Sequence, residues 1–134
     1  MTKEQLIQKS KEARELSYSP YSNFAVGAAL LAKNGKVYLG CNIENSSYTP
    51  TICAERVAFF KAVSEGVKEF EAIAIVGGKT KEDGRFCAPC GVCRQVMAEF
   101  CNKDFKIILG DRHHIEEFTL ESILPLAFTP TDLK

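Results

Sequence analysis

Three cysteines, one glutamate and one arginine are the residues of this chain whose types and spacing are best suited to chemistry. They lie in two short segments, Cys53-Ala54-Glu55-Arg56 and Pro89-Cys90-Gly91-Val92-Cys93. Three thiolates can hold one zinc ion and leave its fourth position for water, which is the pattern of catalytic rather than structural zinc sites. A carboxylate two residues from a ligand can move protons to and from that water. The two segments together predict a hydrolytic zinc site with Glu55 as its general acid and base.

The choice of ligands is not forced by spacing, because Cys87-Ala88-Pro89-Cys90 is also a Cys-x-x-Cys pair. Pro89 is well suited to a helix start. Cys90 and Cys93 would then lie about one turn apart on one face, near a helix N-terminus that stabilises thiolates. Cys87 precedes this start, so we expect it to be an unligated thiol, and it is the rival for a ligand position.

The remaining cysteines, Cys41 and Cys101, are expected to be small buried side chains. A redox pair formed by Cys90 and Cys93 is an alternative, but it leaves Cys53 without a role. Three thiolates and Zn²⁺ sum to one negative charge, which opposes ionisation of a bound water. A guanidinium on a thiolate would offset that charge, and Arg56 is placed for this role; the alternative is an exposed helix cation.

The composition is that of one globular domain spanning residues 1–134. The chain is 46% hydrophobic and 25% charged, and its 17 basic and 17 acidic residues give a formal net charge of zero. A neutral chain lacks the basic surface that nucleic acid requires. No apolar run approaches the roughly 18 residues of a membrane helix, and no signal-peptide block precedes the first polar stretch. We expect a cytoplasmic protein that binds neither membrane nor nucleic acid, and the spacing of its cysteines favours metal ligation over disulfides.

The order of predicted elements indicates an α/β fold with a mixed sheet, because a hairpin is followed by strands that alternate with helices. Asn34-Gly35 is a strong hairpin signal. Within the second helix, Val57, Phe59, Phe60 and Val63 are candidates for burial, and Gly77-Gly78 is expected to end the third strand. The expected helices cover 3–16, 53–64, 90–101 and 120–124, and the strands cover 24–32, 37–41, 71–76, 106–109 and a short segment near 115.

Three further features, a polar pair, a phenylalanine and a histidine pair, have two interpretations each. Asn42 and Glu44 point the same way in an extended segment, so they could hold a pair of sugar hydroxyls or form a solvated strand end. Phe24 could be a substrate contact or a core residue. His113-His114 invites a metal hypothesis, but the pair lies away from the cysteine segments, so we interpret both as surface residues.

With these residues in place, the chain closely resembles the small, homotetrameric cytidine deaminases over nearly its whole length, from about Leu6 to Phe128. Five segments in order are far more specific than any one of them. The resemblance implies a three-layer α/β/α sandwich around a five-stranded mixed sheet, and the conversion of cytidine and deoxycytidine to their uridine counterparts with release of ammonia. The matching segments are 18–30, 40–45, 53–56, 89–95 and 124–128.

The resemblance also implies roles for individual residues. Zinc would be held by Cys53, Cys90 and Cys93, and Glu55 would carry protons to N3 and to the leaving amine. The pyrimidine ring would meet Phe24 and the backbone near Ala54, and the sugar hydroxyls would meet Asn42 and Glu44. Phe128, together with Tyr48, would reach into the active site of a neighbouring subunit. Two departures are the extra thiol of Cys87 and a rather long loop from Gly78 to Phe86.

Two other functions compete with the nucleoside deaminase. A deaminase acting on another base or on nucleic acid is disfavoured by the zero net charge and by Glu44, because a carboxylate repels phosphate. The same carboxylate favours nucleosides over nucleotides. A non-catalytic zinc module in a binding protein would instead need a fourth protein ligand to the metal.

Overall fold

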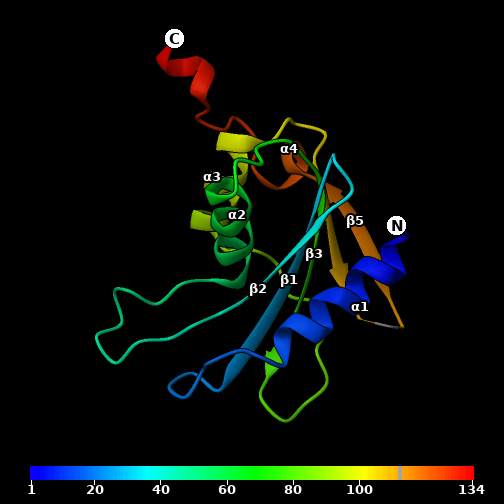
Figure 1. Cartoon of the computed structure of the whole chain (residues 1–134), viewed down its shortest axis with the longest axis vertical. Coiled ribbons are helices and arrows are strands. Elements are labelled where there is room, and N and C mark those ends of the chain that lie inside the picture. Colours follow the sequence, from blue (N-terminus) through cyan, green and yellow to red (C-terminus); the bar gives the residue numbers. More distant parts are fainter. Residues whose placement is uncertain (112) are drawn as a thin grey trace.

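A five-stranded mixed sheet organises the chain, and helices cover both of its faces (Figure 1). The computed structural model describes residues 1–111 and 113–134. The strands lie in the order β2-β1-β3-β4-β5. The elements are α1 (Lys3–Arg14), β1 (Phe24–Ala32), β2 (Val37–Cys41), α2 (Ala54–Ser64), β3 (Phe70–Lys79), α3 (Gly91–Phe100), β4 (Lys106–Gly110), β5 (Ile115–Thr119), α4 (Leu120–Ile123) and the 3₁₀ helix η1 (Pro130–Leu133).

The strand directions follow from the connections. β1 and β2 form an antiparallel hairpin whose turn contains Asn34-Gly35, with Gly35 at φ +91°, as the dipeptide predicts. β1 is also antiparallel to β3. β3 and β4 are parallel, with α3 as the crossover, and β5 returns antiparallel to β4. The sheet is therefore mixed, and its parallel pair lies in the second half of the chain, as expected.

Two apolar layers separate the sheet from its helices. On one face, α1 buries Leu6 and Ile7 against Ala29, Ala74 and Val76. α1 begins at a capping box formed by Thr2 and Gln5, which satisfies free N–H groups at its N-terminus. On the other face, α2 and α3 bury a larger cluster that includes Phe59, Met97 and Ile107. The three-layer α/β/α fold class is confirmed.

The second helix packs unusually close to the sheet, and this changes which of its side chains are buried. A side-chain carbon at Gly40 of β2 would lie 2.3 Å from the carbonyl oxygen of Ala54. Ala54, Ala58 and Ala62 therefore form the buried stripe of α2, together with Phe59. The expectation that Phe60 is buried was wrong: it is 44% exposed, because it lies outside the stripe that the three alanines and Phe59 form.

The third strand is longer than its apolar run. We expected Gly77-Gly78 to end it, but β3 continues to Lys79 because Gly77 pairs with Val26 and Gly78 with Ala25. The polar loop therefore begins after Lys79. The strand continues because the nine-residue β1 offers backbone partners along its whole length.

The chain ends in a segment that stands away from the sheet and its helices. Leu124–Thr129 leads to η1, which projects beyond α3 (Figure 1). A capping box between Thr129 and Asp132 starts this short helix, which the sequence analysis did not predict. Within the described part of the chain, no helix is long and apolar enough to cross a membrane.

Candidate metal and catalytic site

Two helix starts bring the predicted cysteines together. Cys53 is the N-cap residue of α2 and Cys90 is the N-cap residue of α3, while Cys93 lies in the first turn of α3. The Sγ atoms of Cys53 and Cys90 are 3.7 Å apart, and those of Cys90 and Cys93 are 3.5 Å apart. Among residues 1–111 and 113–134, these three thiols form a group of potential metal ligands whose atoms all lie within 4.8 Å of one another.

The donor set suits zinc in both chemistry and size. Thiolate sulfur is a preferred zinc ligand, and Zn–S bonds of about 2.3 Å in a tetrahedron place neighbouring sulfurs about 3.8 Å apart. The measured separations of 3.5 and 3.7 Å are close to this spacing. Three converging thiols leave a tetrahedral ion one further position. The residues present therefore fit zinc with an open coordination site.

The other three cysteines lie outside this group. Cys87 packs against the backbone of β3, where a side-chain carbon at Gly77 would come within 2.7 Å of its Sγ. Burial raises the pKa of the Cys87 thiol to about 11, and the nearby negative charge of Glu55 acts in the same direction. Burial also raises the pKa of Cys41, and that of Cys101 to about 12. Position therefore separates these three thiols from the cluster, since their sulfur atoms do not join the group formed by Cys53, Cys90 and Cys93.

The thiols of the cluster differ in their readiness to ionise. Hydrogen bonding from Cys93, with help from Arg56 and Cys90, outweighs desolvation and lowers the pKa of Cys53 to about 5. The same hydrogen bond to Cys53, together with burial, raises the pKa of Cys93. A metal that binds both sulfurs needs both as thiolates, so ligation would release a proton that the pair shares.

Glu55 is a buried carboxyl group beside the cluster. It lies in the first turn of α2 and is 4% exposed. Burial raises the pKa of Glu55 to about 7, and the charge of Cys53 contributes in the same direction, while hydrogen bonding to Cys93 opposes the rise. Both protonation states are then accessible near neutral pH, as a group that accepts and returns protons requires.

Arg56 contacts the cluster from the same helix turn. Its Nη2 donates a hydrogen bond of 3.4 Å to Sγ of Cys53, and this contact raises the pKa of the guanidinium. The Nε of Arg56 is buried and has no hydrogen-bond partner among the described residues. The expectation of an exposed helix cation does not describe this side chain, which is partly buried and directed at a sulfur.

Asn42 is tied into the backbone at the start of β1. Its Nδ2 donates to the carbonyl of Phe24 at 2.8 Å, and its Oδ1 accepts from the N–H of Val26 at 2.9 Å and from the hydroxyl of Ser17. These bonds extend the β1–β2 pairing through a side chain. An amide nitrogen carries two N–H groups, so one remains for a ligand after the bond to Phe24.

Glu44 lies near the loop before β1 and accepts three hydrogen bonds from it. Oε1 accepts from the backbone N–H groups of Tyr21 and Ser22 at 2.9 and 3.1 Å, and Oε2 accepts from the Ser22 hydroxyl. The Ser22 hydroxyl bond is the main reason why the pKa of Glu44 lies below its ordinary value. Glu44, Tyr21, Ser22, Tyr48 and Thr51 line an open hollow of about 380 Å³.

The remaining predicted residues lie at the starts of α2 and β1, in the loop after β2, and near the chain end. Ala54 is fully buried at the start of α2, and Phe24 is partly buried at the start of β1. Tyr48 is 71% exposed and contacts Tyr21 edge-to-face, with ring centroids 6.1 Å apart. Phe128 is 58% exposed and is held through its backbone carbonyl, which accepts from Gln95.

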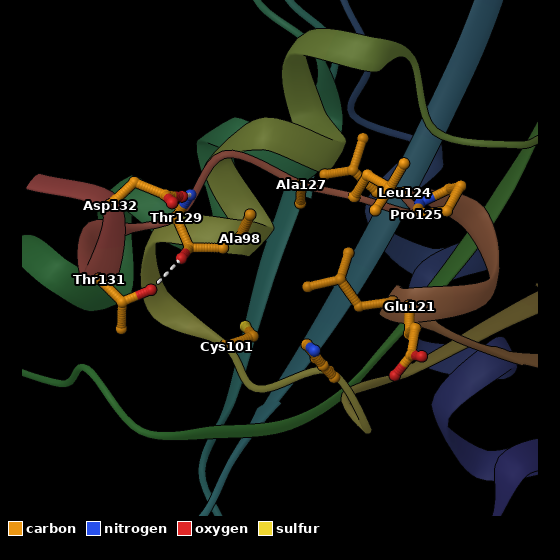
Figure 2. Close-up of a pocket in the computed structure, with 12 residues that line it drawn as sticks. Ala98, Cys101, Glu121, Leu124, Pro125, Ala127, Thr129, Thr131 and Asp132 are labelled. Atoms are coloured by element: carbon orange, nitrogen blue, oxygen red, sulfur yellow. Dashed lines mark hydrogen bonds between the residues drawn. The ribbon is translucent and has the colours of Figure 1, made fainter.

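A second cavity, of about 420 Å³, lies between the end of α3, α4 and the chain end (Figure 2). Its described lining includes Cys101, Glu121 and Asp132 but none of the clustered cysteines. Within it, the hydroxyls of Thr129 and Thr131 are hydrogen-bonded at 2.6 Å (Figure 2). The cavity separates the chain end from the helix layer and is distinct from the thiol cluster.

His113 and His114 are both exposed, as expected, and their backbone N–H groups donate to Asp111 Oδ1. The sequence analysis missed two residues that organise the site. Arg14 donates four hydrogen bonds to carbonyls around the loop after β3. Ser22 links Glu44 to Phe24. No local sequence signal marks either one, because their partners come from other parts of the chain.

Comparisons with known proteins give a consistent result. Residues 1–109 match the family model described as "Cytidine and deoxycytidylate deaminase zinc-binding region". A protein named cytidine deaminase from Sporosarcina psychrophila is 54% identical over 134 residues, covering 99% of this chain and 96% of the relative. One of the same name from Halalkalibacterium halodurans is 51% identical over 99% of this chain and 98% of its own length. The crystal structure of cytidine deaminase from Burkholderia pseudomallei superposes with a TM-score of 0.87 at 45% identity, covering 96% of this chain and 100% of that one.

Proposed function

Because the chain belongs to the cytidine and deoxycytidylate deaminase family, we propose that it is a cytidine deaminase that hydrolyses free cytidine and 2′-deoxycytidine to uridine and 2′-deoxyuridine. Water supplies the new oxygen at C4, and the exocyclic amine leaves as ammonia. The observation that carries this proposal is the convergence of three thiols beside one buried carboxyl group. Salvage of pyrimidine nucleosides is the metabolic use that such a reaction suits.

Cys53, Cys90 and Cys93 are the proposed zinc ligands. When bound, zinc supplies a Lewis acid that makes water a nucleophile at neutral pH. The N-cap position of Cys53 favours the thiolate form that ligation needs, because free N–H groups and the helix dipole stabilise negative charge there. The sulfur separations support this ligand set, and the position of Cys87 against Gly77 supports its exclusion.

Glu55 is the proposed proton carrier. The reaction transfers both protons of the attacking water: the first goes to N3, and the second goes from the new C4 hydroxyl to the amine before it departs as ammonia. A single carboxyl group can carry each proton in turn if it ionises near the working pH. Burial and the raised pKa of Glu55 support this role, and its place two residues after Cys53 keeps it near the metal ligands.

Arg56 is proposed to offset the excess negative charge of the three thiolates. Three thiolates carry more negative charge than one divalent cation offsets. A guanidinium that donates to Cys53 Sγ reduces the excess and orients the ligand. The buried Nε of Arg56 has no partner among the described residues, so the guanidinium keeps a further donor.

Phe24, Asn42, Glu44 and the backbone of Ala54 are the proposed binding surface for the nucleoside. Asn42 keeps one free N–H, and the carboxylate of Glu44 keeps one acceptor position after its three hydrogen bonds, so the pair can serve one donor and one acceptor of a sugar. An ionised carboxylate in this position disfavours a phosphate group, which supports nucleosides over nucleotides.

Tyr48 and Phe128 are the proposed contributions to a neighbouring subunit's site. Both are large, exposed apolar rings, and Leu126 beside Phe128 is fully exposed. Apolar side chains in such positions are consistent with an oligomer that covers them. We propose a homotetramer with shared active sites, and activity that is lost when the subunits are separated.

One assay tests the proposed function directly. Purified protein is incubated with cytidine, deoxycytidine, cytidine 5′-phosphate and deoxycytidine 5′-phosphate, and deamination is followed by ultraviolet absorbance. The proposal predicts turnover of both nucleosides and of neither nucleotide. Equal rates on nucleosides and nucleotides would contradict the role given to Glu44, and turnover of neither class would contradict the proposed activity.

A further inference from the structure

Ser22 forms a hydrogen-bonded link between the two ends of the proposed nucleoside surface. Its hydroxyl accepts the backbone N–H of Phe24 at 3.0 Å and donates to Oε2 of Glu44. The other possible acceptor for this hydroxyl proton, the carbonyl of Phe24, is 3.5 Å away. The proton is therefore directed at the carboxylate, and the strand end that carries Phe24 is connected to Glu44 through one side chain.

The link fixes which part of Glu44 is left for a ligand. A carboxylate offers about four acceptor positions. The backbone N–H groups of Tyr21 and Ser22 use Oε1, and the Ser22 hydroxyl uses one position on Oε2. The acceptor position that remains is on Oε2, beside the hollow that Tyr21, Tyr48 and Thr51 help to line. Without the Ser22 hydroxyl, two backbone donors on one oxygen would still tether the carboxylate, but nothing on the loop would orient the other oxygen.

We propose that Ser22 is a positioning residue that sets specificity for the sugar, by holding the free acceptor of Glu44 at a fixed place relative to Phe24. This inference rests on the proposed role of Glu44 in binding sugar hydroxyls. A sugar with 2′- and 3′-hydroxyls then gains from the alignment, whereas a sugar that lacks both does not. The alignment acts on binding in the ground state and the transition state alike, so it changes KM rather than kcat.

A purely structural role makes a different prediction. If the Ser22 hydroxyl only stabilises the turn from Tyr21 to Phe24, its loss disturbs Phe24, which is proposed to meet the base. Every substrate with a cytosine ring would then be affected alike, whatever its sugar. The comparison of a sugar that has the 2′- and 3′-hydroxyls with one that lacks both therefore separates the two roles.

The test uses steady-state kinetics of the full-length zinc-loaded enzyme and its Ser22→Ala, Ser22→Thr and Glu44→Gln variants. KM and kcat are measured for cytidine, and kcat/KM for 2′,3′-dideoxycytidine is taken from progress curves at low concentration. Ser22→Ala should raise the KM for cytidine by about 3- to 10-fold, the contribution of one ordinary hydrogen bond, and change kcat less than about twofold. Its kcat/KM for dideoxycytidine should match that of the unchanged enzyme, and Ser22→Thr should restore the KM.

Each other outcome overturns a defined part of the proposal. An equal loss on both substrates would assign Ser22 to the turn alone, and an unchanged KM for cytidine would remove its positioning role. Glu44→Gln should raise the KM for cytidine by about tenfold or more, because a hydrogen bond to a charged acceptor is lost. If Glu44→Gln leaves that KM unchanged, the proposed role of Glu44 fails, and the inference about Ser22 fails with it for that separate reason.

Discussion

Replacing Arg14 by methionine should destabilise the protein far more than a surface substitution on the same helix. Arg14 is the last residue of α1. Its guanidinium donates hydrogen bonds of 2.8–3.0 Å to four carbonyls, those of Ala25 in β1, Gly78 and Lys79 in β3, and Glu82 in the following loop. The bonds to Ala25 and Gly78 are partly buried, and the other two are exposed. Methionine keeps much of the apolar stem but none of the donors.

The magnitude follows from the burial of these carbonyls. A hydrogen bond from a charged donor contributes about 1.5–3 kcal/mol, and exposed carbonyls recover most of their loss by binding water. The two partly buried bonds therefore dominate. Because water also reaches part of these two carbonyls, we discount their sum, and Arg14→Met should lower the free energy of unfolding by about 2–4 kcal/mol. Lys9→Met is the matched control, because Lys9 pairs with Glu12 on the exposed surface of the same helix. Such a pair contributes about 0–1 kcal/mol.

Urea denaturation at equilibrium measures both variants, with an unchanged slope as the check on two-state behaviour. Hydrogen exchange should locate the damage: the amides of Thr80 and Arg85, which bond to Asn23 and Gly77, should exchange faster in Arg14→Met. This loop leads to Cys87 and Cys90, so its loosening should also weaken zinc retention. An Arg14→Met protein as stable as Lys9→Met would refute the stabilising role given to the hydrogen bonds of Arg14.

Three further predictions concern the thiol cluster. Metal analysis should find one zinc per chain. The variants Cys53→Ala, Cys90→Ala and Cys93→Ala should each lose the zinc, whereas Cys87→Ala should keep both zinc and activity. Loss of zinc in Cys87→Ala but not in Cys93→Ala would overturn the ligand assignment. Arg56→Ala should retain zinc but move the rising limb of the pH–rate profile to higher pH, because uncompensated negative charge makes ionisation at the metal harder; an unshifted profile would remove Arg56 from charge balance. The third prediction concerns protein from which a chelator has removed the metal. The pKa of Glu55 is about 7 in the folded protein against 4.5 for an ordinary glutamate, so its contribution to stability is complete below pH 4.5 and is lost as pH rises through 7. Glu55→Gln should abolish about 2–3 kcal/mol of the fall in unfolding free energy between pH 5 and pH 8, and parallel pH curves for the two proteins would contradict the burial argument.

Much of the fold could be predicted because its signals are local. Asn34-Gly35 between two apolar runs predicted the hairpin, and Pro89 before Cys90 predicted where α3 begins. The cysteine cluster was predictable for the same reason, since Cys53 and Cys90 both fall at helix starts. Patterns of this kind require only neighbouring residues, so one sequence is sufficient to find them.

The errors arose where tertiary packing overrides local pattern. Hydrophobicity placed Phe60 in the core, but the close approach of α2 to Gly40 turns the alanine stripe inward and leaves Phe60 outside. The glycines at 77 and 78 were expected to end a strand, but their strand partners on β1 keep them in it.

Residues that act through distant partners carried no local signal at all. Arg14 reaches carbonyls up to 68 positions away in the chain, and Ser22 reaches Glu44 across 22 positions. Asn42 was identified as polar and aligned with Glu44, but its three bonds to Phe24, Val26 and Ser17 became visible only in the structure. Side chains of this kind determine geometry rather than chemistry, so residue type alone does not reveal them.

The most direct test of the account is to measure zinc content and cytidine turnover in one preparation of Glu55→Ala, with Glu65→Ala at the end of the same helix as the control. Glu55 is proposed to carry every proton of the reaction without binding the metal. The Glu55→Ala protein should therefore keep one zinc per chain and its fold, and lose about 10⁴-fold or more in kcat, at or beyond the upper end for a general acid–base group. A Glu55→Ala protein that keeps its zinc and deaminates cytidine at a rate near that of Glu65→Ala would contradict the account.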